Sequence, residues 1–163
     1  MTTSSGEQEA VRLERAVDAF VKRIRAVPVE LLTRPPAAGE WTFMELAAHS
    51  AEIYAYWAKQ LAYVRAHPGQ PFGRTASDLD RIRFVEEHKS DSLDGLVERI
   101  QRGAQAAAAE LRAFTNYEWR TVTGLHAARG LMDMDFIAHL FVSGHAEEHL
   151  KQLEETLTKV AAP

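Results

Sequence analysis

Apolar residues recur every three or four positions in four separate stretches of the chain, as they do along one side of an amphipathic helix. In the first three stretches these residues are Val11, Leu13, Val17, Phe20, Val21 and Ile24, then Phe43, Leu46, Ile53, Trp57, Leu61 and Val64, then Leu93, Leu96, Val97, Ile100, Ala104, Ala107, Leu111 and Phe114. The fourth stretch extends from about Asp133 to Val160. The pattern predicts four helices of several turns each.

Residues that start or stop helices lie at the ends of these stretches. Pro28 ends the first one, and Thr42 with Glu45 three residues later matches the capping box at the start of a helix. The run His67-Pro68-Gly69 ends the second helix, and residues 90–92 (Ser-Asp-Ser) are N-cap candidates for the third. The boundaries therefore support the helices that the apolar pattern predicts.

The connecting segments carry weaker signals. Residues 78–88 predict a short helical turn, and residues 116–130, which contain Gly124 and Gly130, show no sustained period and are expected to form a long connection. We find no convincing alternation of apolar and polar residues that would indicate a strand. Four helices with one apolar face each predict an all-α fold, a four-helix bundle.

Composition and charge limit the number of domains, the possible partners and the location of the protein. A chain of 163 residues with 46% hydrophobic content is expected to form one domain over residues 1–163, with residues 1–8 flexible. The net charge of −4 and the scattered Lys and Arg residues argue against a nucleic-acid partner. No apolar run reaches the roughly 20 residues of a membrane helix, and the start of the chain lacks the features of a signal peptide. We expect no membrane association and a cytoplasmic location.

The sequence contains no cysteine. Disulfide bonds, thiolate metal ligands and a cysteine nucleophile are therefore excluded. Any thiol chemistry would have to use a thiol that comes from outside the protein.

Two histidines lie one turn apart on the predicted fourth helix. His145 and His149 differ by about 40° around the helix axis and lie within its apolar face. A buried ring nitrogen without a partner costs roughly 1 to 3 kcal/mol, and a metal ion is one solution. On the second helix, His49 lies within about 60° of Leu46 and Ile53 and could meet the pair.

Three neutral imidazoles suit zinc, nickel or ferrous iron, and three protein ligands leave room for water or substrate. The alternative is that these side chains are core histidines bonded to the backbone or to water. Of the other histidines, His67, His88 and His126 lie at predicted helix ends or in loops and are expected in solvent, while His139 lies about 120° from His145 and misses its face.

Three further polar residues allow two roles each. Glu45 lies one turn before His49 and could accept a hydrogen bond from its ring, although the capping role explains it equally well and is favoured. Gln152 could bind a ligand or be an exposed helix position. Tyr56 could line a pocket mouth or be an aromatic residue at the rim.

Two segments resemble the signature motifs of the DinB-like superfamily. They are Gly39-Glu40-Trp41-Thr42-Phe43-Met44-Glu45-Leu46-Ala47-Ala48-His49 and His145-Ala146-Glu147-Glu148-His149-Leu150-Lys151-Gln152-Leu153. The resemblance implies an up-down-down-up bundle with a long crossover between helices two and three, and a metal at one end of the bundle. It also implies the ligands His49, His145 and His149, and the sequence departs from the pattern at none of these positions. A homodimer is implied by the resemblance alone.

The function follows less directly, because one fold serves many activities. Members of the DinB-like superfamily include transferases and isomerases that use bacillithiol or mycothiol. Three interpretations stay open: a metal-dependent transferase that activates an external thiol, a hydrolase with a metal-bound water, and a non-catalytic metal-binding or interaction module. The first two would act on a small-molecule substrate, with zinc or nickel as the favoured metal and iron as a third choice.

Overall fold

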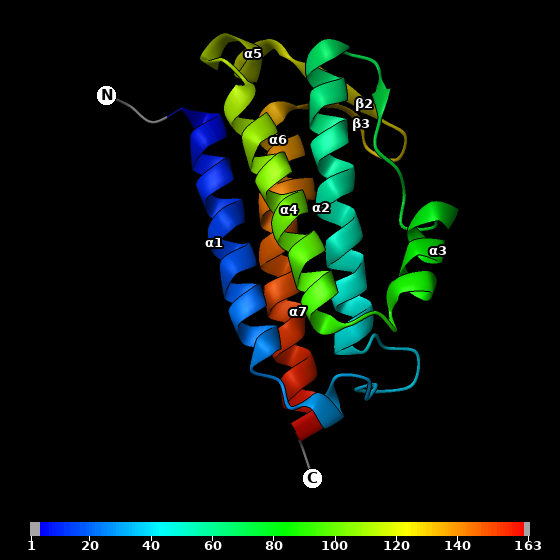
Figure 1. Cartoon of the computed structure of the whole chain (residues 1–163). Coiled ribbons are helices and arrows are strands. Elements are labelled where there is room, and N and C mark those ends of the chain that lie inside the picture. The colour runs from blue at the N-terminus through cyan, green and yellow to red at the C-terminus, as the bar shows by residue number, and fades with distance from the viewer. Residues whose placement is uncertain (1–3, 162–163) are drawn as a thin grey trace.

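Four long helices lie side by side and form a bundle (Figure 1). They are α1 (Ser5–Arg25), α2 (Phe43–Ala66), α4 (Leu93–Ala113) and α7 (Gly144–Ala161). In this computed structural model, which describes residues 4–161, α1 and α7 run in one direction and α2 and α4 in the other. The up-down-down-up order and the long crossover from α2 to α4 confirm the predicted fold.

The core lies between these helices, and the predicted apolar faces supply it. Helix α2 packs against α4 and α7, and α1 packs against the same two helices from the other side. The six apolar residues predicted to face the core from α2 are all buried: Phe43, Leu46, Ile53, Trp57, Leu61 and Val64. None of the helices within residues 4–161 combines the length and the apolar character needed to cross a bilayer.

The predicted helix boundaries are largely confirmed. The Thr42 side chain accepts a hydrogen bond from the Glu45 backbone N–H at 3.2 Å, and the Glu45 carboxylate accepts one from the Thr42 backbone N–H at 2.9 Å. Helix α2 ends at Ala66, directly before the predicted stop, and Ser92 caps α4 through the backbone N–H of Gly95 at 3.2 Å. Local sequence thus determines where α2 and α4 begin.

Helix α1 starts earlier than expected. Residues 1–8 were predicted to be flexible, but Ser4 is an N-cap that accepts a hydrogen bond from the Glu7 backbone N–H, and the helix begins at Ser5. The reason is packing, since Gly6 and Ala10 are buried in the first turns. Residues 1–3 lie outside the described part of the chain. After α1, a 3-10 turn at Val29–Leu31 leads toward α2.

The crossover between α2 and α4 contains more structure than a single turn. Strand β1 (Pro71–Phe72) is followed by α3 (Leu79–His88), a helix of ten residues with Asp78 as its N-cap. Helix α3 lies outside the bundle, against α2 (Figure 1). The crossover therefore covers one side of α2.

The segment 116–130 is not the irregular connection that the sequence predicted. It forms α5 (Asn116–Thr121) and β2 (Thr123–His126), and β2 pairs antiparallel with β3 (Gly130–Asp133) and parallel with β1. Strands of two and four residues are too short to display a period of two in the sequence, which is why the small three-stranded sheet was missed.

The predicted fourth helix is interrupted. It consists of α6 (Met134–Ala138), a π-helical turn η2 (His139–Ser143) and α7, where one uninterrupted helix from about Asp133 to Val160 was expected. The backbone N–H of Gly144 donates to the carbonyl of His139, five residues earlier. A π-turn inserts one extra residue, so positions before it and after it do not share one helical phase.

Side chains of α1 hold the π-turn in place. The Arg12 guanidinium donates to both carboxylate oxygens of Glu147, at 2.6 and 2.8 Å, and contacts Nδ1 of His139 at 2.8 Å. The hydroxyl of Ser143, which is fully buried, donates to the carboxylate of Glu9. Both sides of the interruption are thereby tied to a neighbouring helix.

Candidate metal centre

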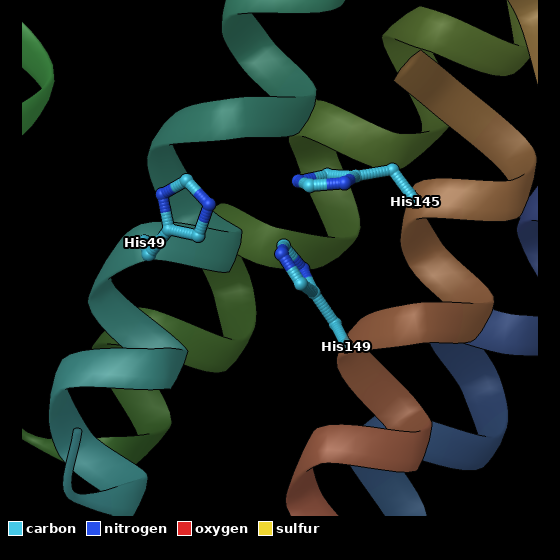
Figure 2. A group of neighbouring side chains, drawn as sticks. All are labelled: His49, His145 and His149. Atoms are coloured by element: carbon cyan, nitrogen blue, oxygen red, sulfur yellow. The ribbon is translucent and has the colours of Figure 1, made fainter. Parts of the chain in front are cut away.

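Three histidine rings converge in the interior of the bundle (Figure 2). His49 comes from α2 and His145 and His149 come from α7, and one ring nitrogen of each lies within 4.8 Å of the others. The ring centroids are 4.3 Å apart for His145 and His149, 4.9 Å for His49 and His149, and 6.0 Å for His49 and His145. The structure thus brings together the three histidines that the sequence singled out.

A serine next to His49 orients one of the rings. Ser50 is fully buried, and its Oγ lies 3.2 Å from Nδ1 of His149. This contact occupies Nδ1 and leaves Nε2 of His149 for a ligand. Metal-binding histidines commonly have such a partner on the second ring nitrogen, because it fixes the tautomer and the ring orientation.

Burial keeps the three imidazoles neutral. It lowers the pKa of His49 to about 2, with Arg81 as the next cause, and it lowers the pKa of His149 well below the usual value. The pKa of His145 is lowered by the same two causes in the same order. A neutral imidazole has a free lone pair, so all three rings are in the form that binds a metal at pH 7.

A buried nitrogen of the His49 ring has no hydrogen-bond partner in the described part of the chain. Nδ1 of His49 is buried and makes no hydrogen bond within residues 4–161. Such an orphaned group costs roughly 1 to 3 kcal/mol unless something satisfies it. Independently of that nitrogen, three neutral imidazoles that converge on one point are a donor set that a divalent transition metal fits.

The low pKa of His49 predicts that the metal-free protein becomes less stable in acid. The folded state keeps this ring neutral down to about pH 2, whereas the ring in the unfolded chain takes up a proton near pH 6.5. The free energy of unfolding should therefore fall as the pH drops below 6.5, by about 2 kcal/mol for this histidine between pH 7 and pH 5. Denaturant titrations at the two pH values measure the change.

The matched variants are His49→Gln and His67→Gln. The first should make the dependence of stability on pH shallower by the share of His49, with the shares of His145 and His149 remaining, and the second, at an exposed ring, should leave it as in the wild type. Equal slopes for the wild type and His49→Gln would contradict the prediction.

Two cavities open beside the three rings. The larger one, of about 610 Å³, is lined by all three histidines together with Trp41, Gln152 and residues of α7. The smaller one, of about 380 Å³, is lined by His49 and His145 and extends toward the sheet. The centre is therefore accessible to small molecules from two directions.

The other four histidines do not join this centre. His67 is exposed, as expected, and His139 lies outside the cluster, as expected. His88 is half-buried at the end of α3, where solvent was expected, with Nδ1 2.8 Å from a carboxylate oxygen of Asp91. The expectation was wrong for His126, which is 4% exposed. It lies on the inner side of β2, a strand that the sequence pattern did not reveal.

The rings of Phe141 and Phe72 enclose His126, with centroids 5.0 and 5.6 Å from its own. Its Nδ1 accepts a hydrogen bond from the Ala128 backbone N–H at 3.2 Å, and its Nε2 lies 3.3 Å from the carbonyl oxygen of Arg74. His126 is thus a satisfied histidine of the packed interior.

The structure distinguishes between the two candidate roles of Glu45, Gln152 and Tyr56. Glu45 caps α2 and has no contact with His49 among its hydrogen bonds, so the capping role is confirmed. Gln152 lines the larger cavity. Tyr56 lines neither cavity beside the three rings. It lines a separate cavity of about 780 Å³, where its ring packs 3.8 Å from the guanidinium carbon of Arg74.

Two residues near the centre were not among the predicted site residues, although Trp41 is part of the motif that precedes His49. The Trp41 ring lies edge-on to His49 with centroids 5.0 Å apart, and the guanidinium carbon of Arg81 lies 5.1 Å from the centroid of Trp41. Arg81 lines both cavities. No sequence pattern marks it, because its position depends on how the crossover folds back over α2.

Comparison with known protein families identifies one family that matches most of the chain. The sequence profile of the DinB superfamily matches residues 12–153. The chain belongs to the DinB superfamily. The match includes α2, α7 and all three histidines of the candidate centre. No curated protein sequence matches this DinB-superfamily chain.

Solved structures share the fold at low sequence identity. YfiT from Bacillus subtilis, described as a probable metal-dependent hydrolase with an unusual four-helix bundle topology, is 15% identical with a TM-score of 0.76, over 97% of this chain and 90% of that one. TT2238, a four-helix bundle protein, is 18% identical with a TM-score of 0.67, over 93% and 99% of the two chains.

The mycothiol-dependent maleylpyruvate isomerase is 15% identical with a TM-score of 0.73. The match spans 94% of this DinB-superfamily chain and 63% of the isomerase. Similarity at this level of identity establishes the common bundle and leaves the reaction open.

Proposed function

We propose that this protein is a metal-dependent enzyme in which His49, His145 and His149 hold one divalent transition metal ion that activates an external low-molecular-weight thiol. The observation that carries the proposal is the convergence of three neutral imidazoles on the wall of two cavities. A structural metal site is closed by four protein ligands, whereas a catalytic site keeps an open position. Three ligands beside open cavities match the second kind.

The donor set favours zinc or nickel, with ferrous iron as a third choice. When bound, such an ion lowers the pKa of a coordinated acid such as a thiol. The thiol has to be external, because the chain contains no cysteine. In the larger cavity, Lys151, Gln152 and Glu155 offer polar side chains of both charge signs to a polar cosubstrate.

The protein itself supplies the orientation of the ligands. Ser50 holds His149, and Trp41 covers one side of His49. Both contacts restrict the rings to one arrangement, so little side-chain freedom remains to be lost when a metal binds.

A second candidate is a metal-dependent hydrolase, in which water takes the place of the thiol. The specific observation in its favour is the likeness to YfiT, which is described as a probable metal-dependent hydrolase and matches over 97% of this chain. The same three histidines would hold the metal, so the two functions differ only in the nucleophile.

Turnover assays on metal-loaded protein test the proposal. We expect conversion of an electrophile such as 1-chloro-2,4-dinitrobenzene that requires both the metal and bacillithiol or mycothiol. Hydrolysis of 4-nitrophenyl acetate that needs the metal and no thiol would favour the hydrolase instead. Absence of both activities in protein that contains one equivalent of metal would support a non-catalytic module and contradict the proposal.

A further inference from the structure

The smaller cavity beside His49 and His145 has an unbalanced charge. Its lining includes three arginines, Arg74, Arg81 and Arg129, and no carboxylate. The larger cavity has three acidic and three basic side chains in its lining: Glu40, Glu148, Glu155, Arg81, Lys151 and Lys159. Only the cavity on the side of the sheet is therefore electropositive.

The charges of its three arginines are not equivalent. Arg74 is neutralised by a short ion pair with Glu52 at 2.5 Å and a longer one with Asp78 at 3.4 Å. Within residues 4–161, no carboxylate lies within 4.0 Å of the guanidinium of Arg81 or Arg129. The two unpaired cations of the cavity are thus Arg81 and Arg129.

Of the two arginines, Arg81 is the better placed to bind an anion. Its guanidinium donates a hydrogen bond to the Ala76 carbonyl at 2.9 Å, and it lies near the Trp41 ring. Its pKa is lowered, first by burial and then by the charge of Arg74, and the charges of Glu52 and Asp78 offset this only in part. A guanidinium in this state gains most from a bidentate oxyanion.

One part of the remaining lining is apolar. Ile53, Trp57, Leu140 and Phe141 line the cavity, and the rings of Trp57 and Phe141 stack with centroids 4.7 Å apart. A cavity of about 380 Å³ suits a molecule of modest size. The lining is complementary to a ligand with one anionic end and an apolar body.

We propose that this cavity binds a small organic acid, with the carboxylate on Arg81 and Arg129 and the apolar body against Trp57 and Phe141. His49 and His145 form part of the same wall, so the bound acid lies beside the candidate metal centre. Its role as the substrate rests on the proposed function, whereas the binding itself does not. The guanidinium chemistry would also accept phosphate, and the apolar wall is what selects the organic acid.

Calorimetric titrations of the zinc-loaded protein test this proposal. The probes are benzoate and hexanoate, with benzamide as the neutral analogue and inorganic phosphate as the anion without an apolar body. We expect the carboxylates to bind at least about tenfold more tightly than benzamide or phosphate. Arg81→Gln should weaken the binding of the carboxylates by about 10- to 100-fold, the usual effect of losing a hydrogen bond to a charged group.

The matched control is Arg83→Gln. Arg83 lies on the same helix, is exposed and pairs with Asp80 at 3.4 Å, so this variant changes the net charge equally and should bind the carboxylates as the wild type does. Arg129→Gln, in the turn between β2 and β3, provides a second test that does not depend on the folding of α3.

Two results would overturn the proposal: equal carboxylate affinity in the wild type, Arg81→Gln and Arg129→Gln, or no binding of either carboxylate to zinc-loaded wild type. Elemental analysis separates this outcome from failure of the proposed function. Protein that contains zinc but does not prefer carboxylates would reject the organic-acid site alone. Protein that binds no metal would reject the proposed function, and the same titrations on the metal-free chain would still test the arginines.

Discussion

Replacing His145 with alanine is expected to remove the metal from the protein. The substitution leaves two of the three nitrogens that converge within 4.8 Å. Loss of an outer-shell partner alone typically costs about 10- to 100-fold in metal affinity, so loss of a direct ligand should cost more than about 100-fold. Elemental analysis after dialysis should change from about one equivalent of metal per chain to a small fraction of that value.

His67→Ala is the matched control, because His67 is exposed and lies outside the three-ring cluster. It should keep the full equivalent of metal. His145 is itself half-buried at the edge of the larger cavity, so its loss should leave the helical circular dichroism unchanged. Full retention of metal in a folded His145→Ala protein would reject the assignment of the ligands.

Gly144→Ala is expected to destabilise the fold and the metal centre together. A Cβ atom at this position would lie 2.3 Å from the carbonyl oxygen of His139, which accepts the hydrogen bond that defines the π-turn. We expect a loss of about 1–3 kcal/mol in the free energy of unfolding, as for other overpacked sites. The metal affinity should also fall, because closing the turn to an α-helix changes the phase of α7 by about 100°.

Gly95→Ala is the comparison at a helical glycine where the added Cβ atom meets no backbone atom. At Gly95 the added Cβ atom meets only the Ser92 side chain oxygen at 3.0 Å, and alanine favours a helix over glycine by roughly 0.5–1 kcal/mol. Denaturant titrations should therefore give a clearly smaller destabilisation for Gly95→Ala than for Gly144→Ala, or none. A Gly144→Ala protein as stable as the wild type would show that the π-turn is not required.

Much of the bundle could be predicted because its signals are local. The capping box at Thr42, the stop after Ala66 and the apolar faces of the long helices all lie within a few residues of the features they determine. The pairing of His145 with His149 was equally local, since four residues make about one helical turn. These features needed no knowledge of the packed structure.

The elements that were missed depend on contacts between distant segments. The pairing of Phe72 with His126 in the sheet joins residues from different parts of the chain, and each strand is short. The π-turn depends on Arg12, which lies in α1. Arg81 faces the histidines only because α3 packs against α2.

The direction of the helices has a consequence for how such a protein can change its specificity. Because α2 and α4 are parallel, the chain after α2 has to travel back along a helix of 24 residues, a distance of about 36 Å, before α4 begins. This return path carries Arg74 and Arg81 to the wall of the smaller cavity. If α2 and α4 were antiparallel, a short loop would join them, and no crossover segment would form this wall of the smaller cavity. The segment that carries these two arginines can therefore change in sequence without a change in the helices that carry the histidines.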